Sequence, residues 1–468
     1  AYEISPRDWS SDVCSSDLGA SLAGMAAALR LDATRLAQQA TFGPTEALIN
    51  DIKTQGGPAW VAQQMALDVS RYTSGGGDSI HRNVGETFFC DTPAQAGNPN
   101  CWRDYFSTEP LLWDFYRQAV SGPDQLRQRV ALALQQVLVV SNLEVSGTYG
   151  FRLYYNNLRA LAFGNYRDVL RKVVLSPVMG EYLDHVNNDK TLPNENFARE
   201  LLQLFSLGTC VLNADGTLAG GSCQPTYDND MVRSYAFALT GWTYPPGGST
   251  TWGCWPEGAN CEYMGADMVA APALRNTAAR TLLAGVSVPA GASAPQALEL
   301  VLDSVMKHPN IGPFVARRLI QNLVSSNPSP AYVGRVAAAF TKGRFRSGGT
   351  SFGAGKPGDL AATVAAVLLD AEARGSASSA GFLRDPLLQF TGVLRALNGH
   401  TDGAPLGWWW GETLRQHVFM PPSVFNFYPP DYPVSGTTLV GPQFGIHNAN
   451  TALERLNYLT YLLDWGGS

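Results

Sequence analysis

Apolar residues recur at intervals of three and four positions along most of this chain, which is the spacing of one face of an α-helix. Ser, Asp or Asn often precedes such a run, and Gly or Pro often follows it, as at helix ends. Strict alternation, the pattern of half-buried strands, is scarce. The predicted helices cover residues 21–31, 34–40, 45–52, 58–67, 124–141, 165–175, 177–185, 194–208, 272–283, 294–307, 312–325, 330–340, 359–369, 385–397 and 448–463. The pattern predicts a mainly α fold, a single large helical domain over residues 19–468.

The run DQLRQRVALALQQVLVVS (124–141) has apolar residues on most faces, so we expect it to be a central helix, capped by Asp124. Residues 71–108 show no regular pattern and are predicted to be irregular. Residues 209–271 are rich in Gly, Pro, Tyr and Trp, which indicates a long irregular loop excursion from the domain.

Composition narrows the class of protein. The chain has 468 residues, of which 45% are hydrophobic, and a formal net charge of −6. Such a chain can bury a substantial core, which excludes global disorder. Its Lys and Arg residues are scattered, which argues against a nucleic-acid partner. No apolar run is long enough for a transmembrane segment.

Residues 1–18, AYEISPRDWSSDVCSSDL, resemble a translated sequencing adapter and differ in composition from the rest of the chain. We interpret them as an artefact and exclude them, with Cys14, from fold reasoning. Whether an export signal precedes the chain is therefore left open.

The other six cysteines form three couples that are local in sequence, each across a loop rich in Gly, Pro or Asn. They are Cys90 and Cys101, Cys210 and Cys223, and Cys254 and Cys261. Metal ligation is the competing interpretation, but no C-x-x-C or zinc-finger spacing is present. Six unrelated buried thiols are the other alternative. Local disulfides are the simplest connectivity and favour a periplasmic or extracellular protein.

Several long motifs carry a family resemblance: NENFARELLQLFSLG, YDNDMVRSYAFALTGW, HPNIGPFVARRLIQNLVSSNPSPAYVGRVAAAF and MPPSVFNFYPPDYP. Together they resemble the exported bacterial family catalogued as domain of unknown function eighteen-hundred, from about Arg35 to the C-terminus. The resemblance implies a helical fold and export. It also implies that a second exported family, of sulfatase-like proteins, frequently accompanies the protein. It implies no activity, and the run Trp408–Trp410 is not recognised as a feature of the family.

The stretch YLDHVNNDKTLPNENFARELLQLFSLG (182–208) concentrates the ionisable residues of a weakly charged chain. We expect a helix capped by Asn194 and ended by Gly208. Its two carboxylates, Glu195 and Glu200, are five residues apart and therefore about 140° apart around the helix. They cannot form a facing pair, so a partner carboxylate has to come from elsewhere, and Asp184 on the preceding helix is the best candidate.

Two interpretations of this stretch remain open. In the first, Asp184, Glu195 and Glu200 supply a general acid and base, as in glycoside hydrolysis, while Arg199 and His185 tune their pKa values. In the second, the same residues form a buried network of carboxylates and Arg199 that locks two helices together.

Aromatic residues in the loops offer a surface on which sugars could stack. The candidates are Trp242, Tyr244, Trp252, Trp255, Trp408, Trp409 and Trp410. Packing of these rings over the core is the alternative.

Other chemistries have less support. The sequence has no nucleophile elbow, phosphate-binding loop or dinucleotide fingerprint. Its six histidines show no metal-binding spacing, so we predict no cofactor. Calcium is the only ion with candidate segments, 213–216 and Asp228–Asp230. Neither segment completes an EF-hand loop, and a turn and a helix N-cap are the preferred roles.

Two functions follow as hypotheses. The first is an exported glycoside hydrolase that acts on a polysaccharide with paired carboxylates. The second is a non-catalytic exported scaffold or partner of a sulfatase-like protein.

Overall fold

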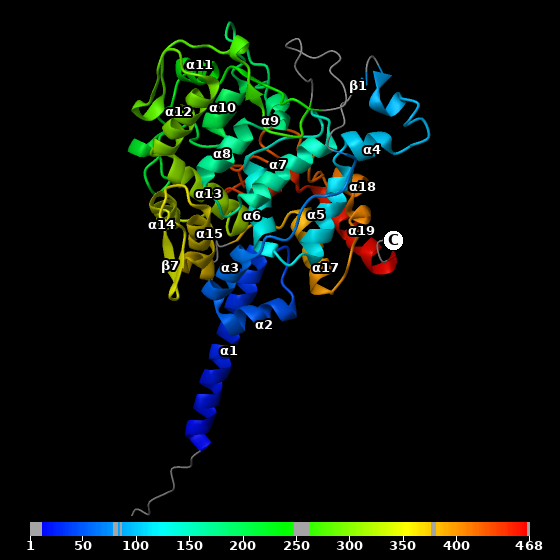
Figure 1. The fold of residues 1–468 in the computed structure, drawn as a ribbon. Coiled ribbons are helices and arrows are strands. Elements are labelled where there is room, and N and C mark those ends of the chain that lie inside the picture. Colours follow the sequence, from blue (N-terminus) through cyan, green and yellow to red (C-terminus); the bar gives the residue numbers. More distant parts are fainter. Residues whose placement is uncertain (1–11, 78–82, 85–86, 248–262, 376–380, 466–468) are drawn as a thin grey trace, which may run out of the picture.

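The computed structural model describes residues 12–77, 83–84, 87–247, 263–375 and 381–465. In these residues the chain forms helices joined by loops, with a few two-stranded ribbons (Figure 1). The prediction of a mainly α fold is confirmed. No helix in the described ranges is both long enough and apolar enough to span a membrane.

The helices account for most of the regular structure. They are α1 (Asp12–Ala40), α2 (Glu46–Gln55), α3 (Gly57–Ala66), α4 (Cys101–Phe106), α5 (Glu109–Ser121), α6 (Gln125–Val137), α7 (Thr148–Ala160), α8 (Tyr166–Val174), α9 (Pro177–Tyr182), α10 (Asn196–Gln203), α11 (Asn229–Ala238), α12 (Ala294–Lys307), α13 (Ile311–Leu323), α14 (Pro330–Lys342), α15 (Leu360–Leu369), α16 (Ala371–Arg374), α17 (Pro386–Ala396), α18 (Trp408–Thr413) and α19 (Ala449–Trp465). Short 3₁₀ helices include η5 (Ala404–Leu406) and η6 (Pro442–Ile446).

The strands pair only with their neighbours along the chain, in antiparallel ribbons of two. The pairs are β1 (Asn83–Val84) with β2 (Thr87–Phe88), β3 (Trp242–Thr243) with β4 (Val269–Ala270), β5 (Arg280–Thr281) with β6 (Ser287–Val288), and β7 (Phe345–Ser347) with β8 (Thr350–Phe352). Ribbons of this size cannot bury a core, which is therefore built from helices.

Helix α6 lies at the centre of the core, as its apolar residues predict. Every residue from Gln125 to Leu134 is buried, and α3, α7 and α13 pack against it. One hydrophobic cluster runs from Ala33 in α1 to Tyr458 in α19.

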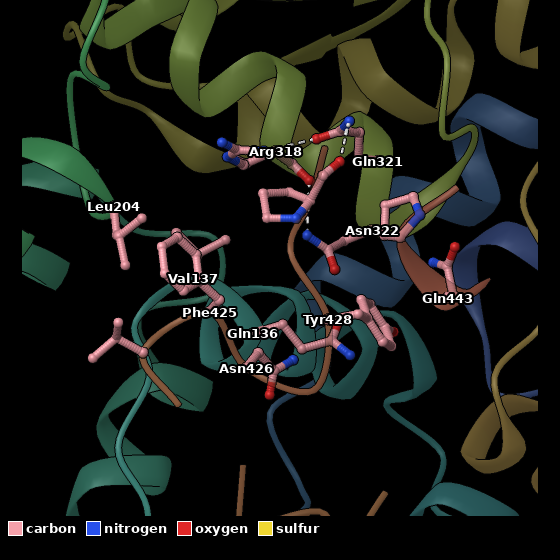
Figure 2. Close-up of a pocket in the computed structure, with 13 residues that line it drawn as sticks. Gln136, Val137, Leu204, Arg318, Gln321, Asn322, Phe425, Asn426, Tyr428 and Gln443 are labelled. Atoms are coloured by element: carbon pink, nitrogen blue, oxygen red, sulfur yellow. Dashed lines mark hydrogen bonds between the residues drawn. The ribbon is translucent and has the colours of Figure 1, made fainter. Parts of the chain in front are cut away.

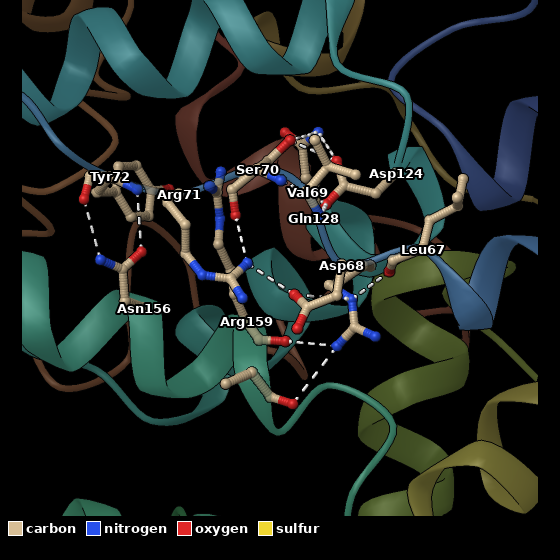
Figure 3. Close-up of polar contacts among 12 residues, drawn as sticks. Leu67, Asp68, Val69, Ser70, Arg71, Tyr72, Asp124, Gln128, Asn156 and Arg159 are labelled. Atoms are coloured by element: carbon tan, nitrogen blue, oxygen red, sulfur yellow. Dashed lines mark hydrogen bonds and ion pairs between the residues drawn. The ribbon is translucent and has the colours of Figure 1, made fainter.

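Asp124 does not cap α6, which corrects the sequence-based expectation. Its carboxylate instead accepts hydrogen bonds from the backbone N–H groups of Val69 (3.1 Å) and Ser70 (2.9 Å) and from the Ser70 hydroxyl. Asn156 pairs with the backbone of Tyr72 two residues later (Figure 3). The buried Asp124 and the half-buried Asn156 thus supply the partners that this irregular segment needs for its backbone.

Four other expectations are corrected by the structure. Residues 21–31 and 34–40 belong to the single helix α1, because neither Gly nor Pro separates them, and its first turns extend away from the body of the molecule (Figure 1). The irregular region 71–108 contains α4 and short strands, and the excursion 209–271 contains α11, capped by the Asp228 side chain. Residues 272–283 form only a 3₁₀ turn and β5.

Arg275 explains why residues 272–283 do not form a helix. Its guanidinium is buried and donates to the carbonyl oxygens of Phe237 (3.1 Å) and Ala238 (2.8 Å) at the end of α11, and to that of Ala292 (3.2 Å). Burial lowers the pKa of Arg275 to about 10. The last carbonyl groups of a helix have no partner within the helix, and here they accept hydrogen bonds from Arg275. These bonds hold the segment around Arg275 against the end of α11.

Two of the three predicted disulfides are present. Cys90 is bonded to Cys101, and Cys210 to Cys223. The third predicted couple, Cys254 and Cys261, lies outside the described residues.

Candidate functional site

The stretch 182–208 forms the end of α9, a polar loop and α10, which packs against α11 (Figure 1). Glu195 occupies the N-cap position of α10, one position later than predicted, but its side chain makes no capping hydrogen bond. The Asn194 side chain instead accepts a hydrogen bond from the backbone N–H of Asn196 at 2.8 Å. Gly208 ends this segment with a φ of 75°, and its N–H donates to the Leu202 carbonyl. That left-handed backbone is the usual reason for glycine after a helix.

Glu195 is engaged in an ion pair. Its carboxylate lies 3.2 Å from Arg199, one helical turn later, and Arg199 also reaches the Asn229 side chain at 3.4 Å. Both partners are about one-third exposed. This ion pair is compatible with a structural role, but neither of its partners is buried as the network interpretation expected.

Glu200 has a different environment. It accepts no hydrogen bond from any described residue, and its Oε2 atom is buried. Burial raises the pKa of Glu200, and the positive charge of Arg199 opposes this effect only in part. Burial, together with the nearby Glu200 carboxylate, raises the pKa of Tyr227 to about 12. Glu200 therefore has the properties of a carboxyl group that keeps its proton to higher pH, as a general acid does.

Asp184 lies on the same side of α10 as Glu200. The Asp184 carboxylate is exposed and accepts a hydrogen bond from the Asn196 side chain at 2.7 Å. Asn196 precedes Glu200 by one turn, a spacing of about 5–6 Å between Cβ atoms. Asp184 also has a φ of 54°, a left-handed conformation that costs free energy in a residue other than glycine. The fold thus brings one exposed and one half-buried carboxyl to the same face of α10.

His185 is not available to tune either carboxylate. Its side chain is 0% exposed, its ring stacks on Phe197 at 4.5 Å between centroids, and neither ring nitrogen has a hydrogen-bond partner. Burial lowers the pKa of His185 to about 3, so the ring is neutral at physiological pH. Its apolar position favours a packing role for this residue.

A surface hollow of about 540 Å³ opens beside Asp184, and we name it the acidic hollow. Its polar lining consists of Glu144, Glu181, Asp184, Asn187, Asn188, Asp189 and Asn194. Glu200 is not among the residues that line it. Sequence reasoning missed Glu144 and Glu181, and the only signal was the density of Asp and Asn in residues 184–189.

Some side chains of the acidic hollow accept hydrogen bonds from other residues, and others have donors that no described residue uses. Tyr244 donates to Glu181 at 2.6 Å, and Thr243 donates to the Asn187 oxygen at 2.6 Å. The amide nitrogens of Asn187 and Asn194 donate to no described residue. The hollow therefore combines carboxylate acceptors with amide donors, which suits a ligand rich in hydroxyl groups.

Only some of the aromatic side chains predicted to bind sugars are exposed to solvent. Trp242 and Tyr244 are 4% and 8% exposed, so both pack in the interior. Trp409 is 66% exposed and contacts the half-buried Trp410 at 4.7 Å between centroids. Trp252 and Trp255 lie outside the described residues, and Trp408 begins α18.

The two segments considered for calcium have structural roles. Residues 213–216 form a turn closed by a backbone hydrogen bond from Asn213 to Thr217, and Asp228 caps α11. Within the described ranges, no cluster of three or more His, Cys, Asp or Glu residues is arranged to hold a metal ion.

Comparison with known proteins gives one result. The family model described as "Protein of unknown function (DUF1800)" matches residues 35–456. No curated protein and no solved structure matches the chain.

Proposed function

We propose that this chain, which belongs to the DUF1800 family, is an exported glycoside hydrolase that uses Glu200 as general acid and Asp184 as its partner carboxylate. One observation carries the proposal. Two carboxyls in opposite environments, one half-buried without a hydrogen bond and one exposed, lie on the same face of α10. In glycosidases, different environments give the two carboxyl groups different pKa values, so that one acts as the acid and the other as the base or nucleophile.

The chemistry follows from those environments. Glu200 would donate its proton to the oxygen of the leaving sugar as the glycosidic bond breaks. Asp184 would stabilise the positive charge that develops on the sugar ring or activate the attacking water. The amide nitrogens of Asn187 and Asn194 would donate hydrogen bonds to sugar hydroxyls in the acidic hollow, which begins at Asp184.

Export is part of the same proposal. The disulfides Cys90–Cys101 and Cys210–Cys223 support it, because such bonds persist in oxidising compartments such as the periplasm or the extracellular space.

The test is hydrolysis of a panel of polysaccharides by the wild-type protein and by Glu200→Gln and Asp184→Asn. Each variant should lower the rate by about 10²–10⁴, the usual contribution of a general acid or base. Asp230→Asn, an exposed carboxylate change on neighbouring α11, is the matched control and should retain full activity. The wild-type rate should fall as pH rises through the Glu200 pKa, and Glu200→Gln should lack that limb. Wild-type activity that persists in both variants would remove the assignment.

A second candidate is the non-catalytic exported scaffold or partner of a sulfatase-like protein. The ion pair between Glu195 and Arg199 and the burial of His185 support it, because these residues then have structural rather than catalytic roles. This candidate predicts that no polysaccharide is cleaved and that Glu200→Gln changes only stability.

A further inference from the structure

A second polar pocket is lined in part by Leu204 at the end of α10, and three of the sequence motifs meet there. Its polar side chains come from α6 (Gln136), α13 (Arg318, Gln321, Asn322), the loop after residue 420 (Asn426) and η6 (Gln443), as Figure 2 shows. We name it the amide pocket. Its volume of about 50 Å³ corresponds to a few water molecules or one small functional group.

Arg318 brings a positive charge into this pocket without a counter-ion. Its guanidinium lies over the Phe314 ring at 5.2 Å, and Nη1 donates to the Gln321 side chain at 3.0 Å. No carboxylate oxygen of the described chain lies within ion-pair distance of it. Burial lowers the pKa of Arg318 to about 10, which reflects this poorly compensated charge.

The surroundings keep the local charge positive. Asn322, which lines the pocket, accepts a hydrogen bond at its backbone carbonyl from the almost fully buried Arg129 at 3.1 Å. Arg317, which is exposed, adds a second positive charge beside Arg318, while Asp431 acts on Arg318 only from a distance. Asp385, the acid that acts on Arg129, is already hydrogen-bonded to Tyr428 and Gln416. An anion in the pocket would therefore meet an excess of guanidinium groups.

The neutral side chains add hydrogen-bonding capacity that the protein leaves unused. The side-chain amides of Gln136 and Asn426 make no hydrogen bond to a described residue. Gln443 is 5% exposed, yet its Oε1 atom has no hydrogen-bond partner. A buried acceptor without a partner costs about 1–3 kcal/mol, and a ligand that donates to it would recover that cost.

We propose that the amide pocket binds the carboxylate end of a small hydroxy- or amino-substituted carboxylate. Arg318 pairs with the carboxylate, Gln136 and Asn426 donate to its oxygens, and Gln443 accepts a hydrogen bond from the substituent. The small volume admits the end group and leaves the rest of the ligand outside. This inference does not depend on the proposed hydrolase function.

Calorimetric titration of the full chain with defined probes tests the proposal. The probes are glucuronate, lactate, alanine, acetate, methylammonium and inorganic phosphate. Lactate, alanine or glucuronate should bind more tightly than acetate, and methylammonium should not bind. The strongest of the three identifies the source of the carboxylate as a hydroxy acid, an amino acid or a uronic acid. Phosphate that binds as tightly as the best carboxylate would overturn the proposal, as would the absence of binding to every carboxylate.

Three variants assign the contacts. Arg318→Gln should weaken carboxylate binding at least tenfold, and Arg318→Lys, which keeps the charge, should restore part of it. Gln443→Leu should bring the affinity for the best probe down to that for acetate. The matched control is Arg317→Gln, which removes the neighbouring exposed arginine and should weaken binding far less than Arg318→Gln does. Equal affinity of wild type and Arg318→Gln, with circular dichroism showing both folded, would refute the assignment, and so would an equal loss in Arg317→Gln.

Discussion

Replacement of His185 by Phe should stabilise this protein, and more so in acid. The ring is 0% exposed, and neither nitrogen has a partner, while its flat face already stacks on Phe197 at 4.5 Å. Phe keeps the stacking and removes two polar atoms whose burial costs about 1–3 kcal/mol each when unpaired. The phenyl ring is slightly larger than the imidazole, and fitting it costs part of this stabilisation. We therefore expect His185→Phe to raise the free energy of unfolding by about 2 kcal/mol at neutral or higher pH.

The pH dependence follows from the lowered pKa. In the unfolded chain His185 takes up a proton below its ordinary pKa of 6.5, whereas in the folded protein it does so only near 3. Between these values the unfolded state binds more protons, so the wild-type protein loses stability as pH falls from 6.5 towards 3. At pH 5 this loss amounts to about 2 kcal/mol. A phenyl ring at this position cannot titrate, so the advantage of His185→Phe over wild type should grow from about 2 to about 4 kcal/mol.

Differential scanning calorimetry at pH 8 and pH 5 measures the effect. For a chain of this size 1 kcal/mol corresponds to about 1 °C, so His185→Phe should raise the melting temperature by about 2 °C and about 4 °C respectively. The smaller His185→Leu should show the same pH difference, and the exposed His400→Gln should show none. An equal gain at both pH values would refute the reasoning, because it would show that His185 ionises in the folded protein.

Three further changes test other parts of the fold. Asp124→Ala removes the acceptor for Val69 and Ser70 and should lower the free energy of unfolding by about 3–5 kcal/mol in urea titrations. Burial raises the pKa of Asp124, but the hydrogen bonds from Ser70, Val69 and Gln128 together outweigh burial and lower this pKa. The wild-type protein should therefore lose this contribution as pH falls through that pKa, and Asp124→Ala should lack that loss. Joint replacement of Cys210 and Cys223 by Ser opens a bond of sequence separation 13 and should cost about 3 kcal/mol; a reducing agent should lower the stability of the wild type by more than that of the variant, which keeps only Cys90–Cys101 of the two described disulfides. Glu200→Gln should be more stable than wild type at pH 7 but not at pH 4, because burial penalises only the charged carboxylate; no gain at pH 7 would contradict its half-buried environment.

Local patterns determined much of the architecture. Helix α12 (Ala294–Lys307) has the bounds that its apolar spacing predicts, and the cap at Asp228 and the two disulfides were predicted from neighbouring residues. Such features depend on contacts between residues a few positions apart, which the sequence displays directly.

Only the tertiary structure decided the roles of the polar residues. A carboxylate at the start of an apolar run predicts a cap, yet Asp124 holds a segment that lies more than fifty residues earlier. Arg275 donates its hydrogen bond to the Ala238 carbonyl at the end of α11, in a segment distant along the chain. His185 and Glu200 differ in burial although both belong to one polar stretch of the sequence. The partners of a buried polar group come from segments distant in the chain, and its desolvation depends on all of them. The sequence by itself therefore located the ionisable stretch and its helices, and the packing around α10 decided that Glu200 is half-buried while Asp184 is exposed.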